Sequence, residues 1–276
     1  MTLFLEAALA FLFGLLIGSF LNVCIYRLPR DLSVVRPRSY CPACEHPIAW
    51  YDNAPLLSYA LLRGRCRHCG AAIPPRYSLV ELLTGILFAA AILHFGNGPL
   101  GWKVCLFAAL QVGLMFADLE CLILPDEFTL GGLAAGLVVA WFVPVQDVTA
   151  RALLWMAGIE AGPHWQSLAE AAAGAALPAG FLWFGGWLFE KIRKKEGLGF
   201  GDVKLIAMIG AFLGLQGALL TLLAGSVLGS VVGLIYIKAT GKDASTYELP
   251  FGTFLSVAAI GAALVGKGFL AWYGHL

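Results

Sequence analysis

The sequence predicts an all-α polytopic membrane protein, with about eight transmembrane helices and a small cytoplasmic zinc-binding domain between the first and the second. Of the 276 residues, 60% are hydrophobic and 13% are charged, and the mean hydropathy is +0.82. A soluble domain is about a quarter charged. A net charge of +1 leaves no surplus of cations for a phosphate backbone, so nucleic acid is excluded as a partner and membrane lipid is expected as one.

The first observation behind this fold class is a series of apolar stretches long enough to cross hydrocarbon. We expect spans at residues 7–26, 78–95, 99–117, 128–144, 171–189, 203–215, 217–237 and 250–273. One helix over 203–237 would be roughly 52 Å long, so the chain is expected to double back around Gly214, Gln216 and Gly217. Residues 1–26 have no basic start and no small-residue cleavage site, which favours a mature helix over a signal peptide.

The second observation is the distribution of cations. Of ten arginines, eight lie between Arg27 and Arg76. A second basic cluster consists of Lys191, Arg193, Lys194 and Lys195. Because basic loops stay in the cytoplasm, the segments 27–77, 118–127, 190–202 and 238–249 are expected on that side.

The third observation is a pair of cysteine motifs in a segment of about 50 residues, which is too small to fold on a hydrophobic core alone. Cys41 and Cys44 form one C-x2-C pair, and Cys66 and Cys69 form the other. The sequences CPACEHPI and CRHCGAAI share the pattern C-x2-C-x3-I, which predicts two similar turns around one structural zinc ion. The chain is thus divided into a first helix at 1–26, a zinc-knuckle domain at 27–77 and a transmembrane catalytic domain at 78–276.

Other interpretations of the cysteines remain open. Two disulfides would suit an oxidising compartment, but the flanking arginines indicate the reducing cytosol. Iron could replace zinc, and His46 or His68 could be ligands, although four thiolates already complete a tetrahedral shell. The remaining cysteines, which lie in or beside apolar spans, are expected to be packing residues: Cys24, Cys105 and Cys121.

Carboxylates at membrane depth are costly and are kept mainly where they act. Asp118 ends the third expected span and Asp202 opens the sixth, so both are expected at the cytoplasmic edge. Two carboxyl groups that meet in a site of low dielectric share a proton, and the pair can then act as general base and general acid. Gly197, Gly199 and Gly201 would allow close approach of an extended peptide. This is the chemistry of an aspartic peptidase.

The charged residues near the membrane edge could also have simpler roles. Asp202 could be the N-cap of its helix and Asp126 could cap the fourth span. Glu81 and Lys204 could be interfacial charges that reach toward water. In a transporter, Asp118 and Asp202 would form a proton or cation relay, although we detect no internal inverted repeat. A membrane-anchored zinc module that only binds a partner would leave the aspartates without a role.

Taken together, the motifs resemble the bifunctional prepilin leader peptidase and N-methyltransferase family, whose peptidase is of the GxGD intramembrane aspartic type. The similarity covers nearly the whole chain. Besides the cysteine pairs, it rests on GSFLNVCIYRLPR at 18–30, RYSLVELLTG at 76–85, ADLECLILPD at 117–126, GFGDVK at 199–204 and ELPFGTFLS at 248–256.

The resemblance implies that Asp118 and Asp202 are the catalytic aspartates, which cleave the leader of type IV prepilins and type II secretion pseudopilins at the cytoplasmic face of the bacterial inner membrane. It implies N-methylation of the new N-terminal residue, usually phenylalanine, with S-adenosylmethionine. Supporting or substrate-binding roles are expected for Gly199, Gly201, Asp126 and Lys204. Neither motif nor spacing indicates where S-adenosylmethionine binds.

Overall fold

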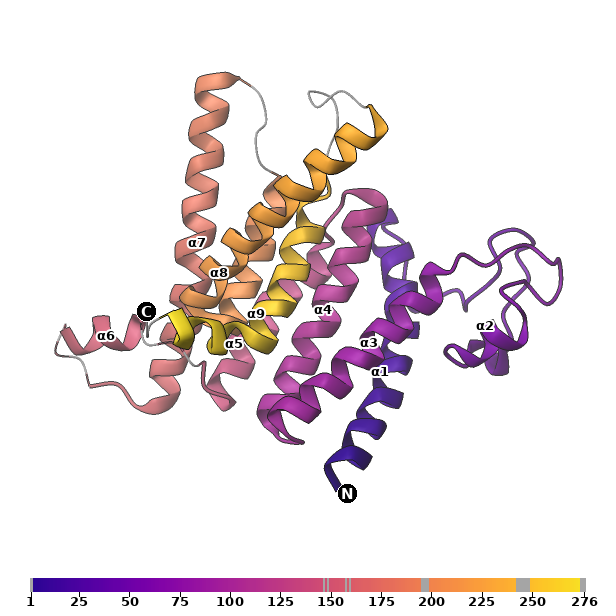
Figure 1. The fold of residues 1–276 in the computed structure, drawn as a ribbon, viewed down its shortest axis with the longest axis horizontal. Helices are drawn as coiled ribbons and strands as arrows, with labels where there is room; N and C mark the ends of the chain where they lie inside the picture. Colours follow the sequence, from indigo (N-terminus) through magenta and orange to yellow (C-terminus); the bar gives the residue numbers. More distant parts are fainter. Residues whose placement is uncertain are drawn as a thin grey trace. The chain divides into compact units, whose positions relative to one another are not determined.

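The computed structural model describes residues 2–145, 147, 149–156, 158, 160–194, 199–241 and 249–273, the last eight by their backbone alone. The described part is helical (Figure 1), and its only β pairing consists of two isolated bridges. The helices are α1 (Thr2–Arg27), α2 (Leu57–Leu61), α3 (Arg76–Phe95), α4 (Pro99–Cys121), α5 (Asp126–Phe142), α6 (Thr149–Met156), α7 (Pro163–Arg193), α8 (Phe200–Thr240) and α9 (Phe251–Tyr273), with 3-10 turns η1 (Leu28–Arg30) and η2 (Trp50–Asn53). The all-α prediction is confirmed.

Five of the described helices are long and apolar enough to cross a membrane: α1, α3, α4, α7 and α8. Helix α5 has 17 residues, and the apolar stretch described in α9 covers Phe251–Val265. The chain is therefore a multi-pass membrane protein. The count of eight spans stays a prediction.

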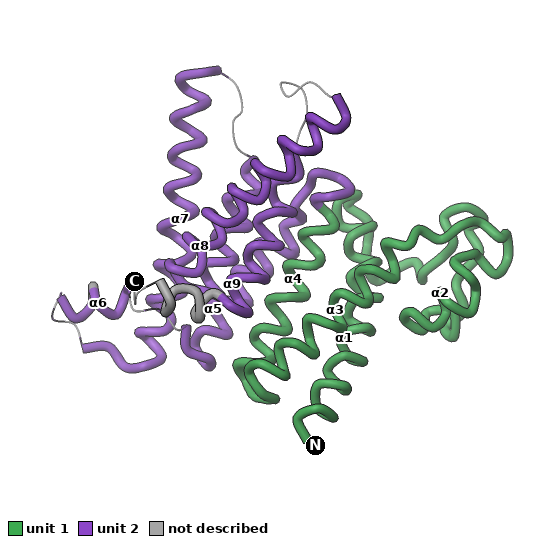
Figure 2. The backbone as a smooth tube through the Cα atoms, in the orientation of Figure 1, with its two compact units in different colours: residues 1–117 green, residues 118–276 purple. Residues whose placement is uncertain are grey.

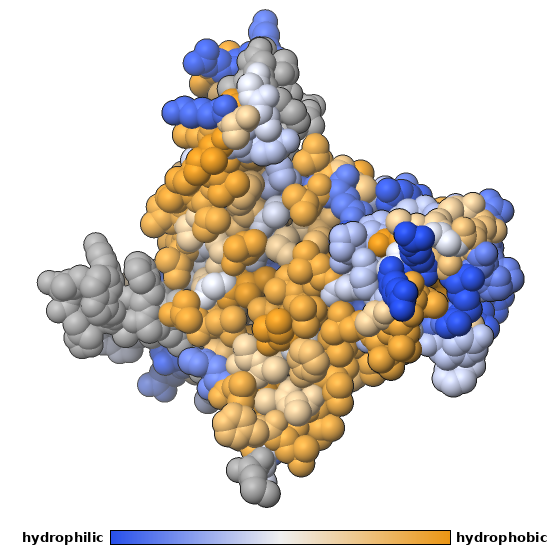
Figure 3. Space-filling view, turned by 45° about the vertical axis from the view of Figure 1, so that its right-hand side comes forward, coloured by the Kyte–Doolittle hydropathy of each residue, from blue (hydrophilic) through white to orange (hydrophobic). Residues whose placement is uncertain are grey.

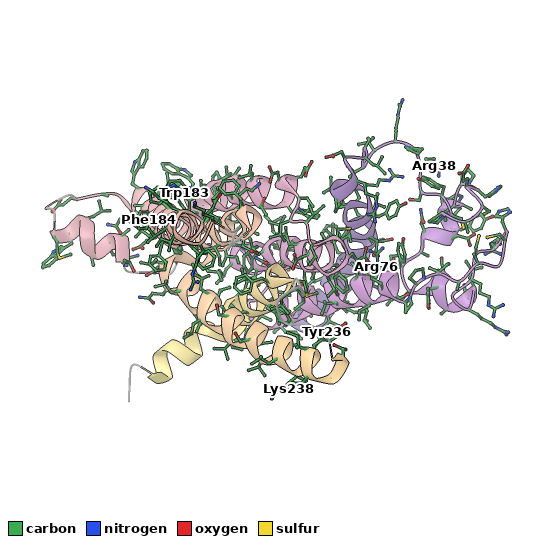
Figure 4. The ribbon with its side chains drawn as sticks, turned by 90° about the horizontal axis from the view of Figure 1, so that it is seen from above. Arg38, Arg76, Trp183, Phe184, Tyr236 and Lys238 are labelled. Atoms are coloured by element: carbon green, nitrogen blue, oxygen red, sulfur yellow. The ribbon has the colours of Figure 1, made fainter. Side chains whose placement is uncertain are left out.

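The surface of the long helices is apolar, as contact with lipid requires. On α1, the side chains of Phe4 and Leu5 are 74% and 63% exposed. On α7, the side chains of Trp183 and Phe184, which are labelled in Figure 4, are more than half exposed. In the space-filling view, hydrophobic residues cover much of the visible surface (Figure 3). In a soluble protein such continuous apolar surface would be a site of association.

The chain divides into two compact units, Met1–Ala117 and Asp118–Leu276 (Figure 2). In the first unit, α1 and α3 cross at glycines. A Cβ on Gly14 would lie 2.8 Å from the Cα of Gly85, and a Cβ on Gly18 would lie 2.6 Å from the Cα of Glu81. Small residues at such crossings let helix backbones approach closely, which is how helices associate in lipid.

Two buried charged residues tie the segment between α1 and α3 to these helices. The guanidinium group of Arg27 donates to the carbonyl oxygens of Ser33 and Pro37, at 2.9 and 2.8 Å. The carboxylate of Glu81 accepts the backbone N–H of Leu56 at 2.8 Å. Glu81 is buried, so the interpretation of this residue as a charge reaching toward water is wrong.

In the second unit, α7 and α8 pack with their backbones in contact. A Cβ on Gly210 would lie 1.9 Å from the carbonyl oxygen of Gly174. Helix α8 is broken at Gly214, whose φ of 78° and ψ of −177° are not helical. Only glycine adopts this conformation without strain.

The break reverses the direction of α8, as its two ends show. At the N-terminal end, a Cβ on Gly201 would lie 3.3 Å from Leu124, whose side chain also lies against Gly252. Near the C-terminal end, a Cβ on Gly233 would lie 3.0 Å from Leu249. Because both ends of α8 approach the segment 249–252, the chain doubles back at Gly214. This prediction is confirmed.

Candidate functional site

Asp118 lies in the last turn of α4, and its carboxylate is held from the start of α9. The side chain is 5% exposed. Its Oδ2 atom accepts two hydrogen bonds from Thr253, one from the backbone N–H at 2.7 Å and one from the hydroxyl group at 3.0 Å. The carboxyl group of Asp118 is therefore fixed in orientation by a residue far away in the sequence.

Asp202 is the third residue of α8 and approaches Asp118. The Asp118 carboxylate is close enough to repel Asp202 electrostatically. The N-cap of α8 is Gly199, so the alternative that Asp202 is the N-cap is wrong. A Cβ on Gly199 would lie 3.4 Å from Oδ2 of Asp202, so an alanine side chain there would touch the carboxylate.

The side chain of Leu124 helps to bring the elements around the aspartates together. It lies in the turn between α4 and α5 and packs against Gly201 on one side and Gly252 on the other. A Cβ on Gly252 would also lie 3.2 Å from the carboxyl carbon of Asp118. Glycine at both positions thus lets α8 and α9 approach this turn.

Asp126 and Lys204 form an ion pair at the same end of the unit. The ammonium group of Lys204 donates to Oδ1 of Asp126. Asp126 is the first residue of α5, and the cap position, Pro125, makes no side-chain bond to the helix. Asp126 therefore does not cap α5 through its side chain, and Lys204 joins α8 to α5.

Of the basic cluster expected on the cytoplasmic side, Lys191, Arg193 and Lys194 lie exposed at the end of α7 and just beyond it. Lys195 and Gly197 lie outside the described residues, as does Glu248 of the motif at 248–256. Thr253 belongs to that motif, but sequence reasoning gave it no role. A threonine within the first turn of a helix is the available signal, since it places a hydroxyl beside free N–H groups.

The four predicted cysteine ligands lie together in the first unit. Their Sγ atoms are all within 4.8 Å of one another, and those of Cys41 and Cys69 are 3.9 Å apart. Tetrahedral zinc with Zn–S bonds of about 2.3 Å places sulfur atoms about 3.8 Å apart. None of the four is in a disulfide. The residues present therefore fit a metal ion with four thiolate ligands.

The two cysteine turns repeat one another, as the sequence predicts. In the first, the N–H of Cys41 donates to His46 and the N–H of Glu45 donates back to Cys41, at 3.0 and 2.8 Å. In the second, the N–H of Cys66 donates to Ala71 and the N–H of Gly70 donates to Cys66, at 2.8 and 3.0 Å. The isolated bridges Tyr40–Pro47 and Arg65–Ala72 occupy matching positions.

The backbone of the second turn favours the ionised form of the Cys66 thiol. Backbone N–H groups of Cys69 and His68 lower the pKa of Cys66 to about 6. For Cys44, the hydrogen bond from the backbone of His46 lowers the pKa, but desolvation and the other three sulfur atoms together outweigh it and raise the pKa to about 12. Four neighbouring thiols cannot all ionise unaided, and a divalent cation would supply the compensating charge.

The rings of His46 and His68 lie in contact, with centroids 3.5 Å apart and planes tilted by 37°. In the part of the chain that the structure describes, the group of candidate metal ligands consists of the four cysteines without a histidine. Of the other cysteines, Cys24 and Cys105 are buried and Cys121 is partly buried.

Comparison with known proteins gives consistent matches. Residues 12–95 match the bacterial peptidase A24 N-terminal domain, and residues 104–234 match the type IV leader peptidase family. No solved structure matches the chain.

Curated relatives carry the name prepilin leader peptidase/N-methyltransferase. The relative from Myxococcus xanthus is 44% identical over 243 residues, which are 86% of this chain and 65% of that protein. The relative from Aeromonas hydrophila is 37% identical over 290 residues, which are 96% of this chain and 93% of that protein. A third, from Aeromonas salmonicida, is 36% identical and covers 99% of this chain and 98% of its own length. The chain therefore belongs to the type IV leader peptidase family.

Proposed function

We propose that this chain is a prepilin leader peptidase and N-methyltransferase of the bacterial inner membrane, with Asp118 and Asp202 as the catalytic pair. Two relatives with that name match this chain over 93% and 98% of their own length. The observation that supports the two residues most strongly is the approach of the Asp118 and Asp202 carboxyl groups at one end of the second unit.

The reaction at such a pair is hydrolysis of one amide bond. One carboxylate takes a proton from a water molecule while the water oxygen bonds to the carbonyl carbon, and the protonated partner gives its proton to the carbonyl oxygen. The resulting diol collapses as the C–N bond breaks. The first carboxyl group passes its proton to the leaving nitrogen, and the second recovers one from the diol. The pair therefore ends as it began.

The orientation follows from charge. In the second unit, the aspartates lie at the end where α7 terminates in Lys191 and Arg193. In the first unit, the cysteine turns lie among eight of the ten arginines. Because basic segments stay in the cytoplasm, we assign both to the cytoplasmic face, with α5, both halves of α8 and α9 completing eight spans.

The substrates are prepilins and pseudopilins. In such a substrate a charged leader in the cytosol precedes an apolar helix in the bilayer, so the bond between them lies at the interface. A pair of aspartates at the cytoplasmic end of the helices would meet that bond. Gly199 and Gly201 would let an extended peptide approach Asp202, and the pair formed by Asp126 and Lys204 would support the site from α5.

The metal and the methyl donor have different roles. Zinc bound by the four cysteines would stabilise residues 28–75 and, with a full set of four protein ligands, would leave no position for substrate. S-adenosylmethionine would donate the methyl group to the new N-terminal amine. We assign no residue to its binding.

The decisive experiment is co-expression of the full chain with a prepilin, followed by mass spectrometry of the pilin N-terminus. We expect a shortened pilin that carries one added methyl group. Asp118→Ala and Asp202→Ala should each abolish the shortening, whereas Glu127→Gln, which changes an exposed carboxylate on α5, should not. Intact prepilin with the unchanged chain would refute the peptidase, and ion uptake without proteolysis would indicate the transporter. A shortened, unmethylated pilin would refute the transferase alone.

A further inference from the structure

We propose that Thr253 is a positioning residue that keeps Asp118 ionised, so that Asp118 serves as the base and Asp202 as the acid of the pair. This inference rests on the proposed peptidase and adds to it an order of proton transfer and a third residue. It is drawn from the unequal surroundings of two chemically identical side chains.

Asp118 is held by donors. The backbone N–H and the hydroxyl group of Thr253 both point at one oxygen of its carboxylate, at 2.7 and 3.0 Å. Hydrogen bonds that a carboxylate accepts favour its charged form. Thr253 is also the third residue of α9, where the N–H groups have no carbonyl of a preceding helical turn to bond and the helix dipole favours negative charge. Its N–H lies 3.2 Å from the carbonyl oxygen of Pro250 and closer to the carboxylate of Asp118.

Asp202 has the opposite surroundings. In the described part of the chain, no hydrogen-bond donor reaches its carboxyl group, and the charge of Asp118 repels it. A carboxyl group that is partly buried, without donors and next to another carboxylate is the one that retains the shared proton. The surroundings therefore assign the proton to Asp202.

The other ionisable groups that the structure describes on α4, α5, α8 and α9 near the pair do not alter this assignment. On α4, Glu120 is exposed, and on α5 Asp126 is paired with Lys204 of α8 while Glu127 is exposed. Helix α9 carries no ionisable side chain between Phe251 and Val265. Among the ionisable side chains of this unit that the structure describes, Asp202 is thus the one whose charge interacts with that of Asp118.

The assignment completes the reaction. Asp118 takes the proton of the attacking water, and Asp202 gives its proton to the carbonyl oxygen. Asp118 then passes its proton to the leaving amine as the C–N bond breaks, and Asp202 recovers a proton from the diol. Thr253 touches neither water nor peptide in these steps and acts only through Asp118.

The test is the pH profile of kcat/KM for prepilin cleavage by the purified full chain. Thr253→Val removes the hydroxyl donor and keeps the shape of the side chain and the backbone N–H. A hydrogen bond to a charged group contributes enough that its loss should move the acidic limb to higher pH by about one unit. Cleavage below that limb should fall about tenfold.

Three further variants separate this role from a structural one. Thr253→Ala removes the same donor without overpacking and should show the same shift, whereas Thr253→Ser restores the donor and should return the limb to its original position. Thr221→Val removes a buried hydroxyl group on α8 that donates to the carbonyl oxygen of Gly217 in its own helix, at 2.8 Å. It should leave the limb unmoved.

The outcomes distinguish this inference from the function on which it rests. If the unchanged chain cleaves prepilin and the limb stays in place in both Thr253→Val and Thr253→Ala, the role of Thr253 is refuted and the peptidase stands. An equal shift in Thr221→Val would also refute it, since the effect would then be general. Absence of cleavage by the unchanged chain would refute the peptidase itself.

Discussion

The cysteine turns and the aspartate pair are built in opposite ways. Each cysteine turn closes through hydrogen bonds within eight residues, such as Cys41 to His46. The aspartate pair depends on contacts between distant segments, since Asp118 and Thr253 are 135 positions apart and Asp126 and Lys204 are 78 apart. A site made of local turns can be recognised in a sequence. A site made by helix packing has to be located by the fold.

This difference predicts which changes disturb which region. The cysteine region should fail when a ligand is lost and should tolerate changes elsewhere. The aspartate end should be sensitive to any change that moves α4, α8 or α9, even at a distance.

The largest effect is expected from Cys41→Ser. Because zinc binding and folding of such a small region are one process, worth about 10 kcal/mol or more, loss of one thiolate should reduce bound zinc from about one per chain to nearly none. Metal analysis of the purified protein measures this. Cys105→Ser is the matched control, since Cys105 is buried on α4 and its sulfur bonds to the carbonyl of Phe88. Undiminished zinc in Cys41→Ser would rule out the four-cysteine site.

Gly210→Ala is expected to have the next largest effect, on the second unit. The added Cβ would lie 1.9 Å from the carbonyl oxygen of Gly174, so α7 and α8 must separate. Overpacking of this kind costs about 1–3 kcal/mol. We expect lower thermal stability and weaker prepilin cleavage, with zinc content unchanged.

The control for this variant is Gly180→Ala on α7, where an added Cβ meets nothing within 4 Å. It should be neutral or stabilise the helix by about 0.5–1 kcal/mol. Equal unfolding temperatures for the two variants would argue against the close crossing.

A smaller effect is expected from Asp147→Asn, at the break of α8. One oxygen of Asp147 accepts the N–H of Gln216 at 2.9 Å, and the other accepts from Thr149. An amide side chain offers one acceptor oxygen, so one of these bonds is lost, at a cost of about 1 kcal/mol. Unfolding in denaturant measures the loss. Glu160→Gln, an exposed change, should have no comparable effect.

The smallest effect concerns Asp52 and Arg67 in the cysteine region. The hydrogen bonds and charge of Arg67 hold the pKa of Asp52 below its usual value of 3.8. The stabilisation is therefore complete above that value and is lost as the pH falls through the lowered pKa. Since the pair is at the surface, its contribution is small.

Carbon NMR of the Asp52 carboxyl group should give a midpoint below 3.8 in the unchanged chain. The midpoint should rise toward 3.8 in Arg67→Gln and stay low in Arg65→Gln. A midpoint that is already normal in the unchanged chain would show that the ion pair does not form in solution.

Much of the fold could be predicted from the sequence because it depends on local chemistry. The apolar stretches determine the long helices, the C-x2-C repeats determine the two turns, and a run of 35 residues from Val203 to Ile237 must bend because it exceeds the bilayer. The reversal was expected around Gly214, Gln216 and Gly217, and the structure places it at Gly214, whose conformation glycine alone accepts without strain.

The sequence by itself thus determined that this is a helical membrane protein with a four-cysteine cluster and two candidate aspartates. The tertiary structure alone decided that Thr253 holds Asp118, that Glu81 is buried against Leu56, and that Asp126 pairs with Lys204. Each of these contacts joins segments that are distant in the chain. Their approach depends on the packing of several helices at once, and no local pattern of residues encodes it.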